Sequence, residues 1–143
     1  MFGGKNENGD SLNTLKTLSY DNGSNELKWN YPSTKGQGPS FRFQHTMIYQ
    51  PEGNYILIYG GRSGTFNYTN CFGDIKILSL KELTWVTPII SGDISSKERF
   101  AHSACLLNGQ LIVFGGYSKG KYCENKVEIL ELSINKAIFV QAK

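Results

Sequence analysis

One stretch decides the fold: Glu98-Arg99-Phe100-Ala101-His102-Ser103-Ala104-Cys105-Leu106-Leu107-Asn108-Gly109-Gln110-Leu111-Ile112-Val113-Phe114-Gly115-Gly116. It occurs earlier as well, from Arg42-Phe43-Gln44-His45 to Tyr55-Ile56-Leu57-Ile58-Tyr59-Gly60-Gly61. The tail of another copy opens the chain as Met1-Phe2-Gly3-Gly4. A stretch that recurs in this way predicts a protein assembled from similar units.

The landmarks of this stretch keep a common period. The glycine pairs lie at 3–4, 60–61 and 115–116, so the copies are 57 and 55 residues apart. Other landmarks keep nearly the same step: Arg42 to Arg99 and His45 to His102 by 57 residues, Trp29 to Trp85 by 56, Trp85 to Phe139 by 54, and Asn13, Asn70 and Asn125 each nine residues after a glycine pair. Several landmarks that recur in phase at this spacing indicate a propeller or a repeat array.

Each copy has the pattern of four strands with no helix between them. The apolar runs at 55–59 and 111–114 end abruptly at a glycine pair, as strands buried on both faces do. Glycine at that position allows a positive φ or a close backbone approach. The runs at 75–80 and 127–132 alternate more, as half-exposed strands do, and a strand around each tryptophan follows.

These features resemble the Kelch-repeat family. The matching features are Arg-Phe-x-His, an apolar run into Gly-Gly, an Asn about nine residues on, and an aromatic residue about 24 residues after the second glycine. The resemblance covers nearly the whole chain. It departs at Phe139, which replaces the last tryptophan, and at Phe72-Gly73-Asp74, where the third strand of the middle copy can begin instead of at Asn70. It implies an all-β fold of Kelch-type β-propeller blades, each a four-stranded antiparallel sheet, in an incomplete propeller.

We expect one Kelch-repeat region over residues 1–143. It divides into a partial blade at 1–31, a blade at 41–88 and a blade at 99–141. A propeller typically closes with four to eight blades, and an array that stops earlier leaves strand edges and apolar faces open. Two hypotheses remain: the chain is a fragment of a longer propeller or a truncated product, or it is complete and closes by self-association.

Charge and composition exclude several classes of protein. The net charge is +3, from 15 basic and 12 acidic residues without a basic run, which gives no support for nucleic-acid or polybasic membrane binding. The apolar runs are too short to cross a bilayer, and the start lacks the pattern of a signal peptide. We therefore expect a cytoplasmic protein without membrane insertion. Three cysteines without a C-x-x-C motif predict no disulfide network, and Cys105, inside an apolar strand, is expected in the core.

Two arginines stand just before the first strand of their blades. Arg42 and Arg99 form, in one interpretation, part of a ring of cations that faces a partner's carboxylates, because Arg suits bidentate recognition. The alternative is an arginine that fixes a neighbouring blade through a buried carboxylate or backbone carbonyls. The sequence leaves both interpretations open.

Residues that recur with the repeat are expected to be structural. The histidines favour a structural hydrogen bond, since metal binding or general-base catalysis needs converging ligands that the sequence does not show. The glycine pairs are not phosphate loops, because no G-x-x-x-x-G-K-[ST] motif occurs and no helix follows. The structural set is Gly3, Gly4, Gly60, Gly61, Gly115, Gly116, His45, His102, Trp29, Trp85 and Phe139.

The loops after the second and third glycine pairs differ between copies, so they are free to serve binding. Loops on a rigid scaffold commonly carry function, and Arg, Tyr and Phe are enriched at protein interfaces. The candidates for partner contact are Arg62, Phe66, Tyr68, Tyr117, Lys119 and Tyr122, together with Arg42 and Arg99.

The resemblance implies a non-catalytic protein–protein interaction module, part of a scaffold or adaptor, with a protein partner and without cofactor or metal. The alternative is an enzyme, since some Kelch-like propellers are copper oxidases with a Tyr–Cys cross-link. Tyr68 lies near Cys71, and Tyr122 is next to Cys123, but the histidines are not placed to complete a copper site. No G-x-S-x-G or H-E-x-x-H motif occurs, so no catalytic residue is predicted.

Overall fold

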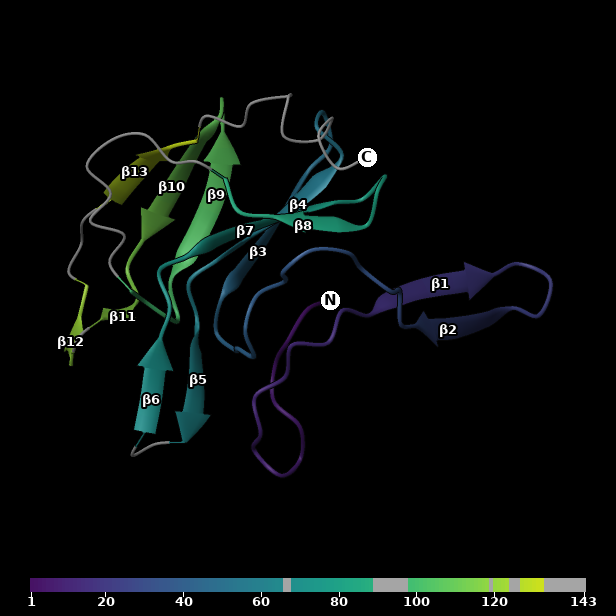
Figure 1. Cartoon of the computed structure of the whole chain (residues 1–143), viewed down its shortest axis with the longest axis horizontal. Coiled ribbons are helices and arrows are strands. Elements are labelled where there is room, and N and C mark those ends of the chain that lie inside the picture. Colours follow the sequence, from purple (N-terminus) through teal and green to yellow (C-terminus); the bar gives the residue numbers. More distant parts are fainter. Residues whose placement is uncertain (66–67, 89–97, 119, 124–126, 133–143) are drawn as a thin grey trace.

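The computed structural model describes residues 1–65, 68–88, 98–118, 120–123 and 127–132. Its regular elements are antiparallel β-strands, which confirms the all-β, propeller-like fold class (Figure 1). The strands are β1 (Thr17–Asp21), β2 (Glu26–Asn30), β3 (Thr46–Gln50), β4 (Tyr55–Tyr59), β5 (Arg62–Thr65), β6 (Tyr68–Cys71), β7 (Ile75–Ser79), β8 (Thr84–Val86), β9 (Ser103–Leu107), β10 (Gln110–Phe114), β11 (Tyr117–Ser118), β12 (Lys121–Tyr122) and β13 (Val127–Glu131). The described residues contain no helix that could span a membrane.

The middle copy forms a four-stranded antiparallel sheet in the order β3-β4-β7-β8. Tyr59, the last residue of β4, pairs with Thr46 of β3 and Ile75 of β7. The continuous apolar sequence of β4 fits its central position, since four of its five residues are buried. The third strand begins at Ile75, close to the Phe72-Gly73-Asp74 alternative.

The loop between β4 and β7 contains a hairpin of its own. β5 and β6 pair with each other in a separate two-stranded sheet, with Arg62 opposite Cys71. The third copy repeats this arrangement with the shorter β11 and β12. The sequence predicts both segments as loops that differ between copies, and the hairpins within them are found only in the structure. In Figure 1 both hairpins extend from the same end of the larger sheets, away from β1 and β2.

The outer copies form smaller sheets. In the third copy the order is β13-β10-β9, and the strand expected around Phe139 lies outside the described residues. In the first copy β1 pairs with β2, and Phe2 forms a single bridge to Leu15. That bridge is the counterpart of the pairing between β4 and β7.

The core lies between successive sheets. One face of the middle sheet packs against the third copy, in a cluster of Tyr55, Leu57, Tyr59, Ile75, Ile77, Leu111, Val113, Leu130 and Leu132. Its other face packs against the first copy, where Ile58, Leu78 and Trp85 join Phe2. The middle sheet is therefore covered on both sides, which is how neighbouring propeller blades pack.

The outward faces of the end copies are exposed. Trp29 is 53% exposed, whereas its counterpart Trp85 is 5% exposed. The Trp85 ring donates a hydrogen bond to Thr34 Oγ1 at 3.2 Å and contacts the edge of the Phe2 ring. Trp29, which is expected to be structural, is thus exposed among the described residues.

Cys105 requires a similar correction. It is exposed, although it lies in an apolar strand. Its side chain shares a sheet face with Ile112 and Ile129, directly opposite it in the register, and Ile129 is 56% exposed. No described segment covers this face of the third copy. An apolar strand predicts burial only where a neighbouring sheet is present.

Candidate partner-binding site

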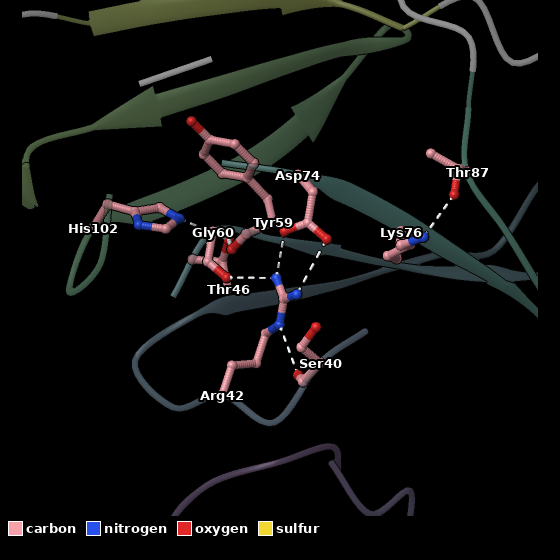
Figure 2. A network of polar contacts seen from close by, with 9 residues as sticks. All are labelled: Ser40, Arg42, Thr46, Tyr59, Gly60, Asp74, Lys76, Thr87 and His102. Atoms are coloured by element: carbon pink, nitrogen blue, oxygen red, sulfur yellow. Dashed lines mark hydrogen bonds and ion pairs between the residues drawn. The ribbon is translucent and has the colours of Figure 1, made fainter. Parts of the chain in front are cut away.

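Arg42 is fully buried at the centre of a polar network (Figure 2). Its guanidinium donates to both carboxylate oxygens of Asp74, at 2.7 and 3.1 Å. It also donates to the carbonyls of Gly60 at 3.0 Å and Ser40 at 3.1 Å, and it stacks 4.3 Å from the centroid of the Phe72 ring. The side chain therefore ties the segment before β3 to the end of β4 and the start of β7.

Arg99 repeats this arrangement in the third copy. It is 1% exposed, donates to the Gly115 carbonyl at 3.1 Å and pairs with the carboxylate of Glu128. The interpretation of Arg42 and Arg99 as partner contacts is therefore wrong. Buried carbonyls at a strand end need donors, and a buried guanidinium needs a carboxylate, so these arginines serve the fold.

Neither carboxylate of these pairs is predicted from the sequence. The Gly60 N–H donates to the Asp74 carbonyl, and the Gly3 N–H donates to the Thr14 carbonyl. Thr14 thus occupies the position of Asp74 in the first copy.

The glycine pairs lie at the junctions between copies. The second glycine of a pair donates its N–H to the carbonyl of the next arginine: Gly4 to Arg42 at 2.9 Å, and Gly61 to Arg99 at 2.8 Å. The first glycine packs against the same carbonyl. A Cβ on Gly60 would lie 2.7 Å from the Arg99 oxygen, and Gly60 has a φ of 66°. Only glycine allows this approach of two backbones.

His45 and His102 lie at the same junctions. The His102 ring meets the edge of Tyr59 with ring centroids 5.0 Å apart, and its Nε2 lies 3.1 Å from Thr46 Oγ1. The His45 ring contacts Phe2 in the same way. The Nδ1 of each histidine is buried without a hydrogen-bond partner among the described residues. Burial first, then the neighbouring arginine charge, lowers the pKa of both rings from 6.5 to about 4.

These histidines predict a loss of stability in mild acid. Because the folded-state pKa lies below the unfolded value, protons bind the unfolded chain more readily. The stabilisation is complete above about pH 6.5 and is lost as the pH falls toward 4, by up to roughly 3 kcal/mol per ring. Urea unfolding of the wild type and His102→Gln at pH 7.5, 5.5 and 4.5 measures this. The pH dependence should be weaker in His102→Gln; an unchanged dependence contradicts the assignment to His102.

A row of cations and aromatic rings crosses all three copies at their surface. We call it the cation–aromatic row: Lys5, Phe43, Arg62, Phe100, Tyr117 and Tyr122. Lys5 Nζ lies 4.4 Å from the centroid of Phe43, and Arg62 Cζ lies 4.8 Å from Phe43 and 4.5 Å from Phe100. The rings then continue from Phe100 to Tyr117 at 5.4 Å and from Tyr117 to Tyr122 at 5.3 Å.

The repeat itself builds this row. Lys5, Arg62 and Tyr117 each follow a glycine pair directly, and Phe43 and Phe100 each follow a buried arginine. Single β-bridges place Arg62 beside Phe43 and Tyr117 beside Phe100. Arg62 also donates through Nε to Gln44 Oε1 at 2.7 Å. The row is thus held by backbone pairing at the start of β5 and β11.

Three of the predicted contact residues meet in this row. Arg62 and Tyr117 are half-buried, while Tyr122 on β12 is 80% exposed. Tyr68 begins β6, and its side chain lies outside the described part of the structure, as do Phe66 and Lys119. The sequence did not point to Lys5, Phe43 and Phe100 as contact residues. Their fixed positions after the glycine pairs and the arginines could have identified them.

The described residues form no metal site of the kind that the enzyme alternative needs. Within the described ranges no three His, Cys, Asp or Glu side chains gather closely enough to hold a metal ion. Cys71 is half-buried, and its burial raises the pKa of its thiol, which disfavours the reactive thiolate.

Comparison with known proteins agrees with the repeat. A family model described as the KLHDC2/KLHL20/DRC7 Kelch-repeats domain matches residues 1–143. The chain belongs to the Kelch-repeat family. The resemblance carried by Arg-Phe-x-His and Gly-Gly is thereby confirmed.

Several larger proteins share this Kelch-repeat region. Host cell factor 1 of Homo sapiens is 36% identical over 110 residues, which cover 74% of this chain and 5% of that protein. Dynein regulatory complex subunit 7 of Chlamydomonas reinhardtii is 29% identical over 121 residues, covering 84% and 10%. A probable serine/threonine-protein kinase of Dictyostelium discoideum is 35% identical over 92 residues, covering 63% and 6%. The Kelch chain thus spans a tenth or less of the length of these relatives.

Proposed function

We propose that this Kelch chain is a non-catalytic protein-binding module of a scaffold or adaptor, and that a protein partner binds at the cation–aromatic row. The observation that carries the proposal is the separation of roles around each glycine pair. Arg42 and Arg99 are buried and hold the fold, while Phe43 and Phe100, next to them along the chain, are half-buried members of a row that is exposed at Lys5 and Tyr122. A rigid surface with Arg and Tyr matches the composition of binding hot spots.

The relatives support the same class of function. One of them is named as a subunit of a dynein regulatory complex, so its name describes a member of a protein assembly. We place this chain in the cytoplasm and give its blades the boundaries 1–31, 41–88 and 99–141. The blade boundaries rest on the repeat pattern.

We further propose that the chain forms part of a larger Kelch propeller. Phe114, Val127 and Ile129 are between 50% and 58% exposed. Phe114 and Val127 occupy the positions of Tyr59 and Ile75, which the third copy covers in the middle sheet. A further repeat fits this face by continuity with the two junctions already present. A discrete, soluble oligomer of the isolated chain in light scattering would argue for self-association instead.

Partner capture tests the row. We expect the double variant Arg62→Ala/Tyr122→Ala to lose at least tenfold in recovered partners relative to wild type, because it removes one cation and the most exposed ring. The matched control, Lys28→Ala/Tyr49→Ala, removes the same residue classes from exposed positions on β2 and β3 and should recover partners as wild type does. Quantitative affinity purification measures both. Equal recovery by the row variant excludes the row as the binding site.

A further inference from the structure

The cation–aromatic row carries two charges without a carboxylate. In the described part of the chain the ion pairs join Lys28 to Asp21, Arg42 to Asp74 and Arg99 to Glu128. None of them involves Lys5 or Arg62. The hydrogen bond to Gln44 engages only Nε of Arg62, so its two terminal nitrogens carry no hydrogen bond to a described residue. Two aromatic rings hold this guanidinium in place. Its two terminal nitrogens can therefore donate hydrogen bonds to a ligand.

The spacing of the two cations limits what can bind them. Lys5 Nζ and Arg62 Cζ lie 4.4 and 4.8 Å from the centroid of the same Phe43 ring, so they are within about 9 Å of each other. Residues i and i+2 of an extended strand are about 7 Å apart and point to the same side. Two carboxylate side chains at that spacing reach both cations at once.

The other end of the row is apolar. In the third copy the position after the glycine pair is Tyr117 instead of a cation, and its ring contacts Phe100 and Tyr122. Aromatic rings with few rotatable bonds bury a partner's apolar side chain at a low entropic cost. The row therefore has a direction, with charge at the first and middle copies and apolar surface at the third.

We propose that the cation–aromatic row binds an extended acidic segment of a protein partner, with two carboxylates two residues apart on Lys5 and Arg62 and an apolar side chain on Tyr117 and Tyr122. This proposal rests on the proposed function and names the chemistry of its partner. A guanidinium fork favours a carboxylate through paired, charge-assisted hydrogen bonds. Flanking rings reduce the water around the charge and strengthen that attraction.

Single-stranded nucleic acid is the competing ligand for a surface of this kind, because bases stack on aromatic rings and phosphates bind cations. Two features disfavour it. The row contains two cations among its six residues, and the whole chain has a net charge of only +3. Binding that follows a phosphate backbone uses many cationic contacts.

Selection from a random peptide display library on the whole chain tests the proposal. We expect a consensus with two acidic residues at i and i+2, followed within about five positions by an apolar residue. Fluorescence anisotropy then measures the selected peptide. Affinity should fall at least tenfold for Arg62→Gln, since a charge-assisted hydrogen-bonded pair is lost, and partly for Arg62→Lys. The control Lys28→Gln should bind as wild type.

Three results overturn the acidic segment. They are a selected consensus without acidic residues, full affinity of a peptide whose acids are replaced by glutamine, and tighter binding of single-stranded oligouridylate at the row. The capture experiment separates these outcomes from failure of the proposed function. If the Arg62→Ala/Tyr122→Ala variant loses its partners while no acidic peptide binds, the row remains a protein-binding site and only its ligand chemistry is wrong.

Discussion

Arg42→Ala will lower the free energy of unfolding by about 3 kcal/mol, the lower end of the cost of breaking a buried ion pair. The substitution leaves Asp74 without its guanidinium and removes the donor from the carbonyls of Gly60 and Ser40. The Asp74 side chain is 38% exposed, so water partly replaces its partner. The buried Gly60 carbonyl loses its bond with less compensation.

Urea unfolding followed by tryptophan fluorescence measures this loss. Trp85 lies on β8, in the same sheet as β7, and Asp74 directly precedes β7. The environment of the buried Trp85 ring changes when that sheet unfolds. Lys28→Ala is the control, because its pair with Asp21 is exposed at 3.4 Å and surface pairs contribute little. Asp74→Asn should cost less than Arg42→Ala, since the amide oxygen still accepts one hydrogen bond. If Arg42→Ala is as stable as the control, the network does not hold the fold.

Gly60→Ala will destabilise the chain much more than Gly115→Ala, by about 2 kcal/mol or more. The two positions have nearly equal φ values, 66° and 68°, so an added Cβ costs both about the same backbone strain, roughly 1–2 kcal/mol. Only at Gly60 would the Cβ meet neighbours, the Arg99 carbonyl oxygen and the His102 ring, each at 2.7 Å. That carbonyl cannot move freely because it accepts the Gly61 N–H at 2.8 Å.

The comparison isolates the junction between the middle and third copies. A Cβ on Gly115 meets no described atom within 4 Å, so Gly115→Ala reports backbone strain alone. Urea unfolding gives both free energies, and NMR signals of the His102 ring show whether the junction has shifted. Equal losses in the two variants mean that close approach at Gly60 contributes nothing to stability.

The sequence predicted much of the fold because strand patterns are local. The apolar run of β4 and the glycine pair after it carry their own signal, and the period repeats that signal. Trp29 and Cys105 show the limit: each has the pattern of a buried residue, yet each is exposed. Burial in a repeat array depends on the neighbouring sheet, which no local pattern describes.

Only part of the cation–aromatic row was predicted from the sequence, because some of its contacts join different copies. Residues in loops that differ between copies pointed to Arg62, Tyr117 and Tyr122. The row also depends on contacts between copies, such as Arg62 against Phe100, which sequence spacing does not reveal. At Arg42 and Arg99 the sequence pointed to residues that do not belong to the site, because both side chains are buried. Whether an arginine faces solvent or a carboxylate is decided by the folded chain, which brings Asp74 or Glu128 to it.

The position of Arg62 also has a mechanical consequence. Its guanidinium lies between Phe43 of the middle copy and Phe100 of the third, within 4.8 Å of both ring centroids. A change in the angle between these two copies would therefore unstack the cation and widen the space around it. By thermodynamic linkage, a ligand that binds Arg62 in its stacked position also stabilises the junction between the two copies, and a change in that junction weakens the binding of the ligand.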